Sequence, residues 1–347
     1  MTVESFSFGV HGGVVVPGFA LRNRHGVTMK VNAYGARLTE LHLPDVRGRT
    51  ADIVLGFDTL DQYVASDAYM GATCGRYGSR IRRGTFPLGG ETILVSCNEG
   101  RNHAHGGNEG FDRKVWRAQG DVAANAVLFT LDSPDGDEGY PGAVAASVSY
   151  RLTDENVLAI DMRAQTDRMT VINLVHHTYW NLAGHGAGEV LAQRLRLNAD
   201  FYTPIDDELI PTGEVRRVDG TPFDFRAAKA IGRDLDQVST ASGGYDHNWR
   251  INGLTDSMRL CATLEDPESG RALELFTTAP GVQCYSGGHF RDPVLGKGDV
   301  RYGQYAGLAL ETQSFPDAPN VGHFPSARLA PGDVYEHRME VRLHHSH

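Results

Sequence analysis

Apolar and polar side chains alternate along residues 144–152, and the alternation resumes along residues 157–164. In the first run Val144, Ala146, Val148, Tyr150 and Leu152 are separated by smaller or polar residues. Successive side chains of a β-strand point to opposite faces, so each run predicts a strand with one buried face. The residues between the runs read TDEN and predict a turn. The whole segment therefore predicts an antiparallel hairpin.

Similar short runs occur at residues 126–131, 272–277, 308–312 and 334–343. Helical periodicity is scarce. It is confined to residues 58–64, where Asp58 is a candidate cap, and to residues 226–236, which Gly232 interrupts. We find no linker, low-complexity tract or internal repeat. The pattern predicts an all-β fold, a large antiparallel β-sandwich with few short helices, as a single domain over residues 1–347.

Charge narrows the range of partners. The 347-residue chain has a net charge of −10 and a pI near 5.8, which argues against nucleic acid and against an anionic membrane surface. The N-terminal residues show no secretory pattern, and no apolar run approaches the ~20 residues that span a bilayer. We expect a cytoplasmic monomer or homodimer that binds a small or neutral molecule. Its four scattered cysteines are expected to be free and buried: Cys74, Cys97, Cys261 and Cys284.

Residues 170–181 contain two adjacent histidines in the phrase VHHTYWN at 175–181. If this segment is one strand, His176 shares a face with apolar residues such as Leu174 and Trp180. His177 shares the opposite face with a polar set, Asn173, Tyr179 and Asn181, as expected at a wet concave site. The alternation predicts that His176 is packed and that His177 is the working residue, although a bulge would reverse the assignment.

Glu311 lies in the apolar phrase GLALETQ, where small residues share its face of the predicted strand. A carboxylate in such a strand is costly unless it is paired or faces a cleft. Glu311 is therefore either a cleft carboxylate or an edge-strand residue in water, and the pattern leaves both open.

Two further segments carry candidate chemistry. The phrase NHAHGG suggests a metal through His103 and His105, but no His or Glu follows at a spacing that completes a ligand set. We expect no metal and no cofactor, and a tight glycine turn that presents His105. The arginine-rich phrase GRYGSRIRRG either covers a solvated surface or turns one guanidinium inward toward hydroxyl groups. It does not follow the pattern of a nucleotide-binding loop.

These segments, in this order, resemble the galactose mutarotase (aldose 1-epimerase) family from about residue 32 to about residue 335. Each phrase alone is weak evidence of a relationship, but so many phrases in the same order do not match by chance. The phrases that carry the resemblance are GRYGSRIRRGTF at 75–86, HGG at 105–107, GFD at 110–112, Trp116, SPDG at 133–136, EGYPG at 138–142, HTYWNL at 177–182, YTPID at 202–206, IPTG at 210–213, YDHN at 245–248, PGVQ at 280–283, ETQ at 311–313 and PDA at 316–318.

The resemblance implies a supersandwich-type β-sandwich and an enzyme that interconverts the α and β anomers of free aldoses by acid–base ring opening and closure. It implies His177 as the acid and Glu311 as the base, because these residues match the family's catalytic pair. It places four more residues in the sugar site: Arg80, His105, Asp246 and Gln283. The implied partner is a monosaccharide.

Two positions depart from the family pattern. Ser79 stands where many relatives have an asparagine before the arginine, which puts a preference for galactose in doubt at this substrate-binding position. His176 stands where many relatives have an asparagine, which agrees with a structural role. Three other functions remain open: a non-catalytic carbohydrate-binding protein, a glycoside hydrolase using two carboxylates, and a sugar-phosphate epimerase of the same fold that uses the extra arginines.

Overall fold

All but one of the alternating runs of the sequence lie in the largest sheet of the protein; the run at residues 308–312 lies in another sheet. The computed structural model describes residues 2–346, and its largest sheet has nine strands. β13 and β14 pair antiparallel with Leu152 opposite Leu158, which confirms the predicted hairpin. In sheet order the strands are β11 (Arg117–Asp121), β12 (Ala126–Ser133), β13 (Val144–Leu152), β14 (Val157–Thr166), β30 (Tyr335–His345), β24 (Arg271–Thr277), β23 (Arg259–Glu265), β18 (Arg194–Leu197) and β21 (Lys229–Ala230).

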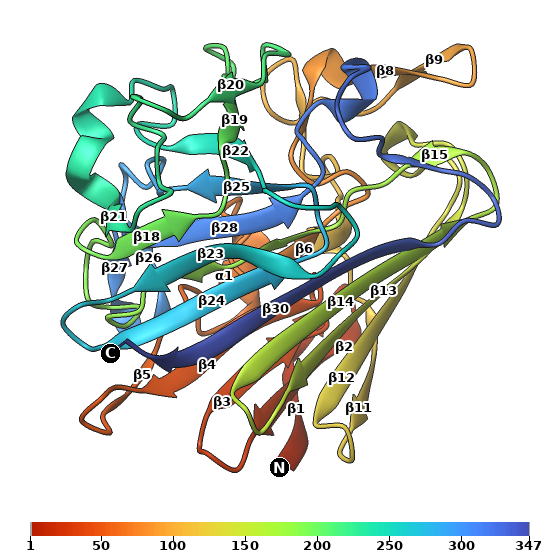
Figure 1. Ribbon diagram of the computed structural model, residues 1–347. Coiled ribbons are helices and arrows are strands. Elements are labelled where there is room, and N and C mark those ends of the chain that lie inside the picture. The colour runs from red at the N-terminus through yellow and green to blue at the C-terminus, as the bar shows by residue number, and fades with distance from the viewer. Residues whose placement is uncertain (1, 347) are drawn as a thin grey trace.

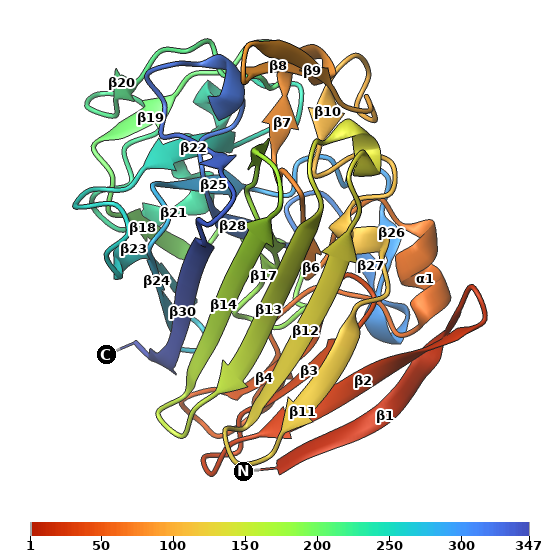
Figure 2. The same ribbon diagram turned by 90° about the vertical axis from the view of Figure 1, so that its right-hand side faces the viewer.

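A second sheet closes the lower part of the molecule near the N-terminus (Figure 2). Its strands, in order, are β1 (Thr2–His11), β2 (Val14–Arg22), β3 (Thr28–Asn32), β4 (Arg37–Pro44) and β5 (Thr50–Asp52). The rings of Phe19 on β2 and Phe129 on β12 meet edge to face with centroids 6.4 Å apart. One buried hydrophobic cluster contains residues of both sheets. The predicted antiparallel β-sandwich is confirmed, and the shared core supports a single domain, which we propose.

A third sheet of six strands occupies the upper half of the molecule (Figure 1). Unlike the nine-stranded sheet, its central strands are buried on both faces: every residue of β25 and β28 is buried. In sheet order its strands are β17 (Tyr179–Trp180), β28 (Leu308–Gln313), β25 (Gly281–Tyr285), β22 (Asp246–Arg250), β19 (Phe201–Thr203) and β20 (Arg216–Arg217).

Short two-stranded ladders surround the six-stranded sheet. They are β6 (Ala72–Cys74) with β16 (Val175–His177), β7 (Arg80–Ile81) with β10 (His103–Ala104), β8 (Thr85–Leu88) with β9 (Glu91–Leu94), β15 (Thr170–Val171) with β29 (Arg328–Leu329), and β26 (Val294–Leu295) with β27 (Arg301–Tyr302).

Both helix predictions need correction in detail. The helix α1 spans Leu60–Ala65, and its N-cap is Thr59 rather than Asp58, because Thr59 and Gln62 form a capping box. The predicted helix at residues 226–236 is wrong over its first half. There Lys229–Ala230 is a strand paired with β18, and a 3₁₀ segment follows at Ile231–Gln237. Short 3₁₀ segments also occur at Arg82–Gly84, Phe111–Arg113, Asp137–Gly139, Lys297–Asp299 and Ala318–Asn320.

The continuous strand predicted at residues 170–181 is also wrong. The chain has three successive partners there, because β15 pairs with β29, β16 with β6, and β17 with β28. Asn173 stands at one of the breaks. Its amide nitrogen donates to the carbonyl of Gly78 at 2.8 Å, and its amide oxygen accepts from the backbone N–H of Ser314 at 2.9 Å. Side-chain bonds of this kind replace the ladder of a regular strand.

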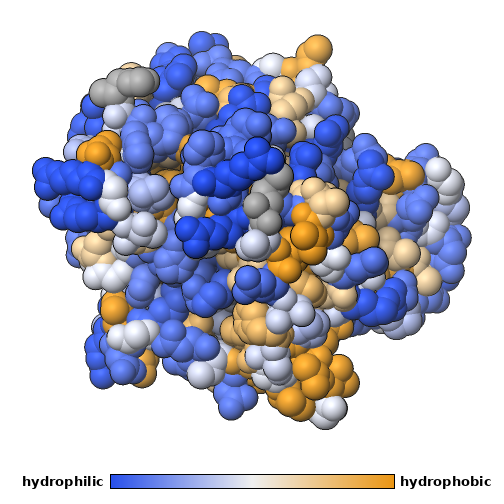
Figure 3. All heavy atoms as spheres, turned by 90° about the horizontal axis from the view of Figure 1, so that it is seen from below, coloured by the Kyte–Doolittle hydropathy of each residue, from blue (hydrophilic) through white to orange (hydrophobic). Residues whose placement is uncertain are grey.

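The surface is mixed in polarity. Viewed from below, it shows hydrophilic residues with separate groups of hydrophobic ones between them (Figure 3). The four cysteines are free, as expected, but only three of them are buried; Cys97 is exposed on a loop. No helix among residues 2–346 is long and apolar enough to cross a membrane.

Candidate active site

One face of the six-stranded sheet gathers three of the predicted site residues. Gln283 on β25 lies directly opposite Glu311 on β28 in the antiparallel register. Asp246 begins β22 and pairs with Tyr285, two residues beyond Gln283 on the same face. The side-chain amide of Gln283 donates to Asp246 at 2.7 Å. The alternation of side chains along each strand, together with the antiparallel register, therefore places Asp246, Gln283 and Glu311 on one face of the sheet.

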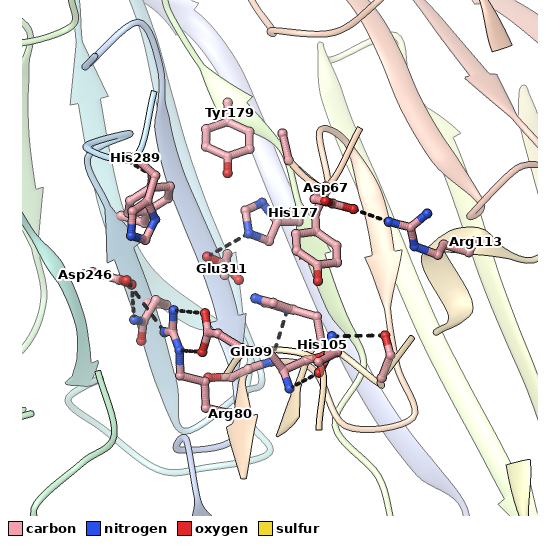
Figure 4. A pocket seen from close by; sticks show the side chains of 18 of the residues that line it. Asp67, Arg80, Glu99, His105, Arg113, His177, Tyr179, Asp246, His289 and Glu311 are labelled. Carbon is pink, nitrogen blue, oxygen red and sulfur yellow. Dashed lines mark hydrogen bonds and ion pairs between the residues drawn. The ribbon is translucent and has the colours of Figure 1, made fainter. Parts of the chain in front are cut away.

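His177 reaches this face from the short strand β16. Its Nε2 lies 3.5 Å from Oε1 of Glu311, and both side chains are 4% exposed. Figure 4 shows the imidazole directed at the carboxylate. Tyr179 lies beside them, its ring centroid 5.0 Å from that of His177. The two residues proposed from the sequence as acid and base are thus neighbours.

The remaining predicted residues come from the β7–β10 ladder. Arg80 on β7 pairs with Ala104 on β10, and His105 follows at the end of that strand. The backbone N–H of Ser79 donates to Nδ1 of His105 at 3.2 Å. A nitrogen that accepts a hydrogen bond carries no proton, so neutral His105 presents Nε2–H as a donor.

The backbone is strained where the pocket residues meet. Tyr69, Ser79 and His105 all have positive φ, at 54°, 69° and 48°. Such conformations are uncommon for residues other than glycine and cluster at functional sites. The ring of Tyr69 packs on both pocket histidines, with centroids 4.6 Å from His105 and 5.7 Å from His177. The ring of Tyr69, on a residue with positive φ, thus packs against both pocket histidines.

Arg80 is held between two carboxylates. Its Nε and Nη2 donate to the two oxygens of Glu99 at 2.6 and 2.9 Å. Its Nη1 lies 3.6 Å from Asp246. Each of the two interpretations of the arginine-rich segment holds for part of it. Arg76 and Arg80 are buried and turn inward, whereas Arg83 is exposed at the surface. Arg76 binds backbone carbonyls outside the pocket.

All seven predicted site residues line one cavity of about 450 Å³. They are Ser79, Arg80, His105, His177, Asp246, Gln283 and Glu311. Sequence reasoning missed Asp67, Tyr69, Glu99 and Arg113, which also line the cavity. Three of these residues lie on irregular segments and Arg113 ends a three-residue 3₁₀ segment, so no periodic pattern could assign them a direction. A glycine near Tyr69 and one beside Glu99 signal turns but not what the turns present.

Burial sets the protonation of the central pair. Desolvation and the charge of Asp246 raise the pKa of Glu311 to about 8, against the opposing effect of Arg80. Desolvation, helped by the charges of Arg37 and Arg80, lowers the pKa of His177 to about 3. The pKa of His105 is also lowered, chiefly by burial and further by the charge of Arg80. At neutral pH the unliganded pair therefore holds one proton, on Glu311, and both histidines are neutral.

The expectation that no residue completes a metal-ligand set around His105 is wrong. Ligand atoms of His105, His177 and Glu311 lie within 4.8 Å of one another. The hydrogen bond from Ser79 opposes their use as ligands, because it leaves the proton of His105 on the nitrogen that faces the pocket. The donor set therefore suits hydrogen bonding to oxygen better than coordination of a metal.

The neighbouring histidine has a different environment. Nδ1 of His176 lies 3.2 Å from the hydroxyl of Tyr150, and Nε2 lies 2.6 Å from that of Thr178. Its ring is buried away from the cavity, which confirms the predicted packing role. The other expectation for this segment is wrong in part: Asn173 and Asn181 are buried and bind backbone carbonyls rather than line the pocket.

The fold and the site together define a β-sandwich protein with a buried histidine–glutamate pair in a polar pocket. Comparison with known proteins agrees. The family model described as aldose 1-epimerase matches residues 18–342. Galactose mutarotase of Bos taurus is 42% identical over 88% of this chain and 87% of its own length. Aldose 1-epimerase of Escherichia coli is 36% identical over 93% and 94%.

Solved structures give the same result. An aldose epimerase homologue from C. elegans superimposes with a TM-score of 0.87 at 31% identity, covering 94% of this chain and 98% of its own. Galactose 1-epimerase from Lactobacillus acidophilus has a TM-score of 0.85 at 30% identity, covering 100% and 99%. The chain belongs to the aldose 1-epimerase family and is an isomerase of the mutarotase type.

Proposed function

We propose that Glu311 is the base and His177 the acid in the interconversion of the anomers of a free, neutral monosaccharide. The observation that carries this proposal is the separation of 3.5 Å between His177 Nε2 and Glu311 Oε1 inside a cavity lined by hydroxyl-binding side chains. A base and an acid must act on two oxygens bound to the same anomeric carbon. Two groups this close can reach both oxygens from one side of the sugar.

The proposed reaction opens and closes the ring. The Glu311 carboxylate takes the proton of the anomeric hydroxyl, the bond between the anomeric carbon and the ring oxygen breaks, and His177 protonates the ring oxygen. The resulting aldehyde rotates about the bond between its first two carbons. The ring oxygen then returns its proton to His177 and attacks the other face of the carbonyl, and Glu311 protonates the new hydroxyl. Both side chains end in their starting states.

The resting protonation corresponds to the middle of this cycle. After ring opening, Glu311 carries the proton and His177 is neutral, which is the state that burial favours in the unliganded pocket. The protein is therefore prepared to close an open-chain aldehyde. A cyclic sugar requires the proton to move from Glu311 to His177, and hydroxyl groups that donate to the carboxylate promote that transfer by lowering its pKa.

The other pocket residues are assigned to orientation and charge stabilisation. Nε2–H of His105 and the guanidinium of Arg80 face the pocket as donors, suited to oxygen that gains negative charge. Asp246 and Gln283 are bonded to each other and offer remaining acceptor and donor positions to sugar hydroxyls. The names of the relatives suggest galactose as one substrate, and Ser79, at the wall of the cavity, is the position where we expect the preference among aldoses to differ.

Polarimetry on freshly dissolved α-D-glucose and α-D-galactose tests the function. We expect the protein to accelerate the approach to the equilibrium rotation of both sugars. Binding of either sugar without faster mutarotation would instead favour a carbohydrate-binding protein. From the sequence we expect either a monomer or a homodimer, and light scattering on the same sample distinguishes the two.

A further inference from the structure

Both arginines that line the cavity already have carboxylate partners. Arg80 binds Glu99 through two parallel hydrogen bonds of 2.6 and 2.9 Å. Arg113 forms an ion pair with Asp67 (Figure 4). We propose that Glu99 is a specificity residue, which makes the pocket select neutral aldoses over aldoses that carry a carboxylate or phosphate group. The inference rests on the function proposed above and names its substrate class more narrowly.

The geometry of Arg80 carries the argument. A substrate carboxylate or phosphate binds an arginine best through two parallel N–H groups. Glu99 occupies that pair, Nε and Nη2, and Asp246 lies 3.6 Å from the remaining terminal nitrogen. An anionic substrate would have to displace a protein carboxylate from Arg80. A neutral hydroxyl group needs only one of the N–H directions that remain.

The charge of the cavity acts in the same direction. Four carboxylates line it, from Asp67, Glu99, Asp246 and Glu311, against the two arginines. Even with a proton on Glu311, the carboxylates exceed the guanidinium groups by one. Three histidines line the cavity: His105 and His177 are buried and add no positive charge while they are neutral, and His289 is exposed. An anion entering this pocket therefore meets net repulsion.

Of the two carboxylates that flank Arg80, Glu99 can be changed with less damage than Asp246. Its side chain is 41% exposed, whereas that of Asp246 is 6% exposed and bonded to Gln283. Glu99 also lines a neighbouring cavity of about 280 Å³, where Arg101 is paired with Glu208 at 2.8 Å. It thus stands at the boundary of the pocket, where its charge acts on an arriving ligand and its loss leaves the sheet intact.

The test compares D-galactose with D-galacturonate, which differ only at the sixth carbon. Mutarotation is followed by polarimetry, and the dissociation constant of each sugar is measured by calorimetry, for the unaltered protein, Glu99→Gln and Glu99→Asp. We expect Glu99→Gln to raise the ratio of kcat/KM for galacturonate over galactose about tenfold at low salt, and to tighten galacturonate binding by a similar factor. The gain should shrink as salt is added. Glu99→Asp keeps the charge and should keep the discrimination.

Glu91→Gln is the matched control, because Glu91 is an exposed carboxylate on β9 that does not line the cavity. It removes the same charge and should leave the ratio within about twofold. Equal ratios and equal galacturonate affinities in Glu99→Gln and the unaltered protein would overturn the proposal. Because binding is measured independently of turnover, a protein that bound these sugars without interconverting them would contradict the proposed function and still decide the question of selectivity.

Discussion

The nine-stranded and six-stranded sheets solve different problems with the same secondary structure. In β13 of the nine-stranded sheet, buried residues alternate with more exposed ones, as in an ordinary sheet that covers one core. In β28 and β25 of the six-stranded sheet every residue is buried, and one face carries Glu311 and Gln283 into a cavity. The nine-stranded sheet stabilises the fold by burying apolar side chains. The six-stranded sheet holds ionisable groups away from water, which lowers the stability of the fold.

The largest contrast is expected between the two adjacent histidines. His177→Asn should reduce kcat about 10²- to 10⁴-fold, because it removes the proposed acid. His176→Asn should change kcat little, and should lower the free energy of unfolding by about 1–3 kcal/mol through loss of the buried contacts to Tyr150 and Thr178. Polarimetry and urea denaturation of the two variants separate these effects. Equal kinetic losses in both would remove the distinction between them.

A change in the nine-stranded sheet should affect stability alone. Ile160 on β14 is fully buried in the core, so Ile160→Ala should lower the free energy of unfolding by about 2–5 kcal/mol. The kcat of the folded protein should stay near that of the unaltered chain, since Ile160 does not line the cavity. A loss of kcat comparable to that of His177→Asn would show that the two sheets are not separable in function.

The stability cost of the site should depend on pH. An unfolded glutamate loses its proton near its usual pKa of about 4.3, whereas native Glu311 keeps it to about pH 8. Between these values the native state binds more protons than the unfolded state, so rising pH destabilises it by at most about 1.4 kcal/mol per unit. Glu311→Gln lacks this term. Denaturation at pH 5 and pH 8 should show the stability of the unaltered protein falling relative to the variant, and a constant difference would contradict the raised pKa.

The rate should follow the single proton of the pair. We expect kcat/KM to be nearly constant at neutral pH and to fall about tenfold per unit above about pH 8, when Glu311 loses the shared proton. The acid limb should lie far lower, since His177 gains a second proton only toward pH 3. Polarimetry in a series of buffers of constant ionic strength measures the profile. An alkaline limb absent up to pH 10 would exclude a titrating Glu311.

The same difference between the sheets explains how far the sequence could be interpreted. The strands at residues 126–131, 144–164, 272–277 and 334–343 were predictable, because one-sided burial leaves a period of two in the chain. The continuous strand predicted at residues 170–181 was wrong, because the chain passes between three ladders there and buries polar side chains on both sides. Within that segment His177 was still singled out, since its alternation with Tyr179 survives the breaks.

Other parts of the site could not have been found in this way. Glu99 and Tyr69 lie on loops, and the direction of a loop side chain depends on backbone angles such as the positive φ of Tyr69 rather than on any period. The grouping of His105 with His177 and Glu311 as potential metal ligands was missed for a related reason. His105 and Glu311 are more than two hundred residues apart in the sequence and are brought together only by the fold. The family resemblance was what placed His105 and Glu311 in one site, and both residues line the cavity.

The role of Glu311 is tested most directly by the mutarotation of fresh α-D-galactose by Glu311→Gln, with galactose binding measured in parallel by calorimetry. We expect a rate at least about 10²-fold below that of the unaltered protein, with binding weakened by less than about tenfold, because the amide keeps the shape of the base and not its function. A rate within a few-fold of the unaltered protein would contradict the assignment of Glu311 as the base.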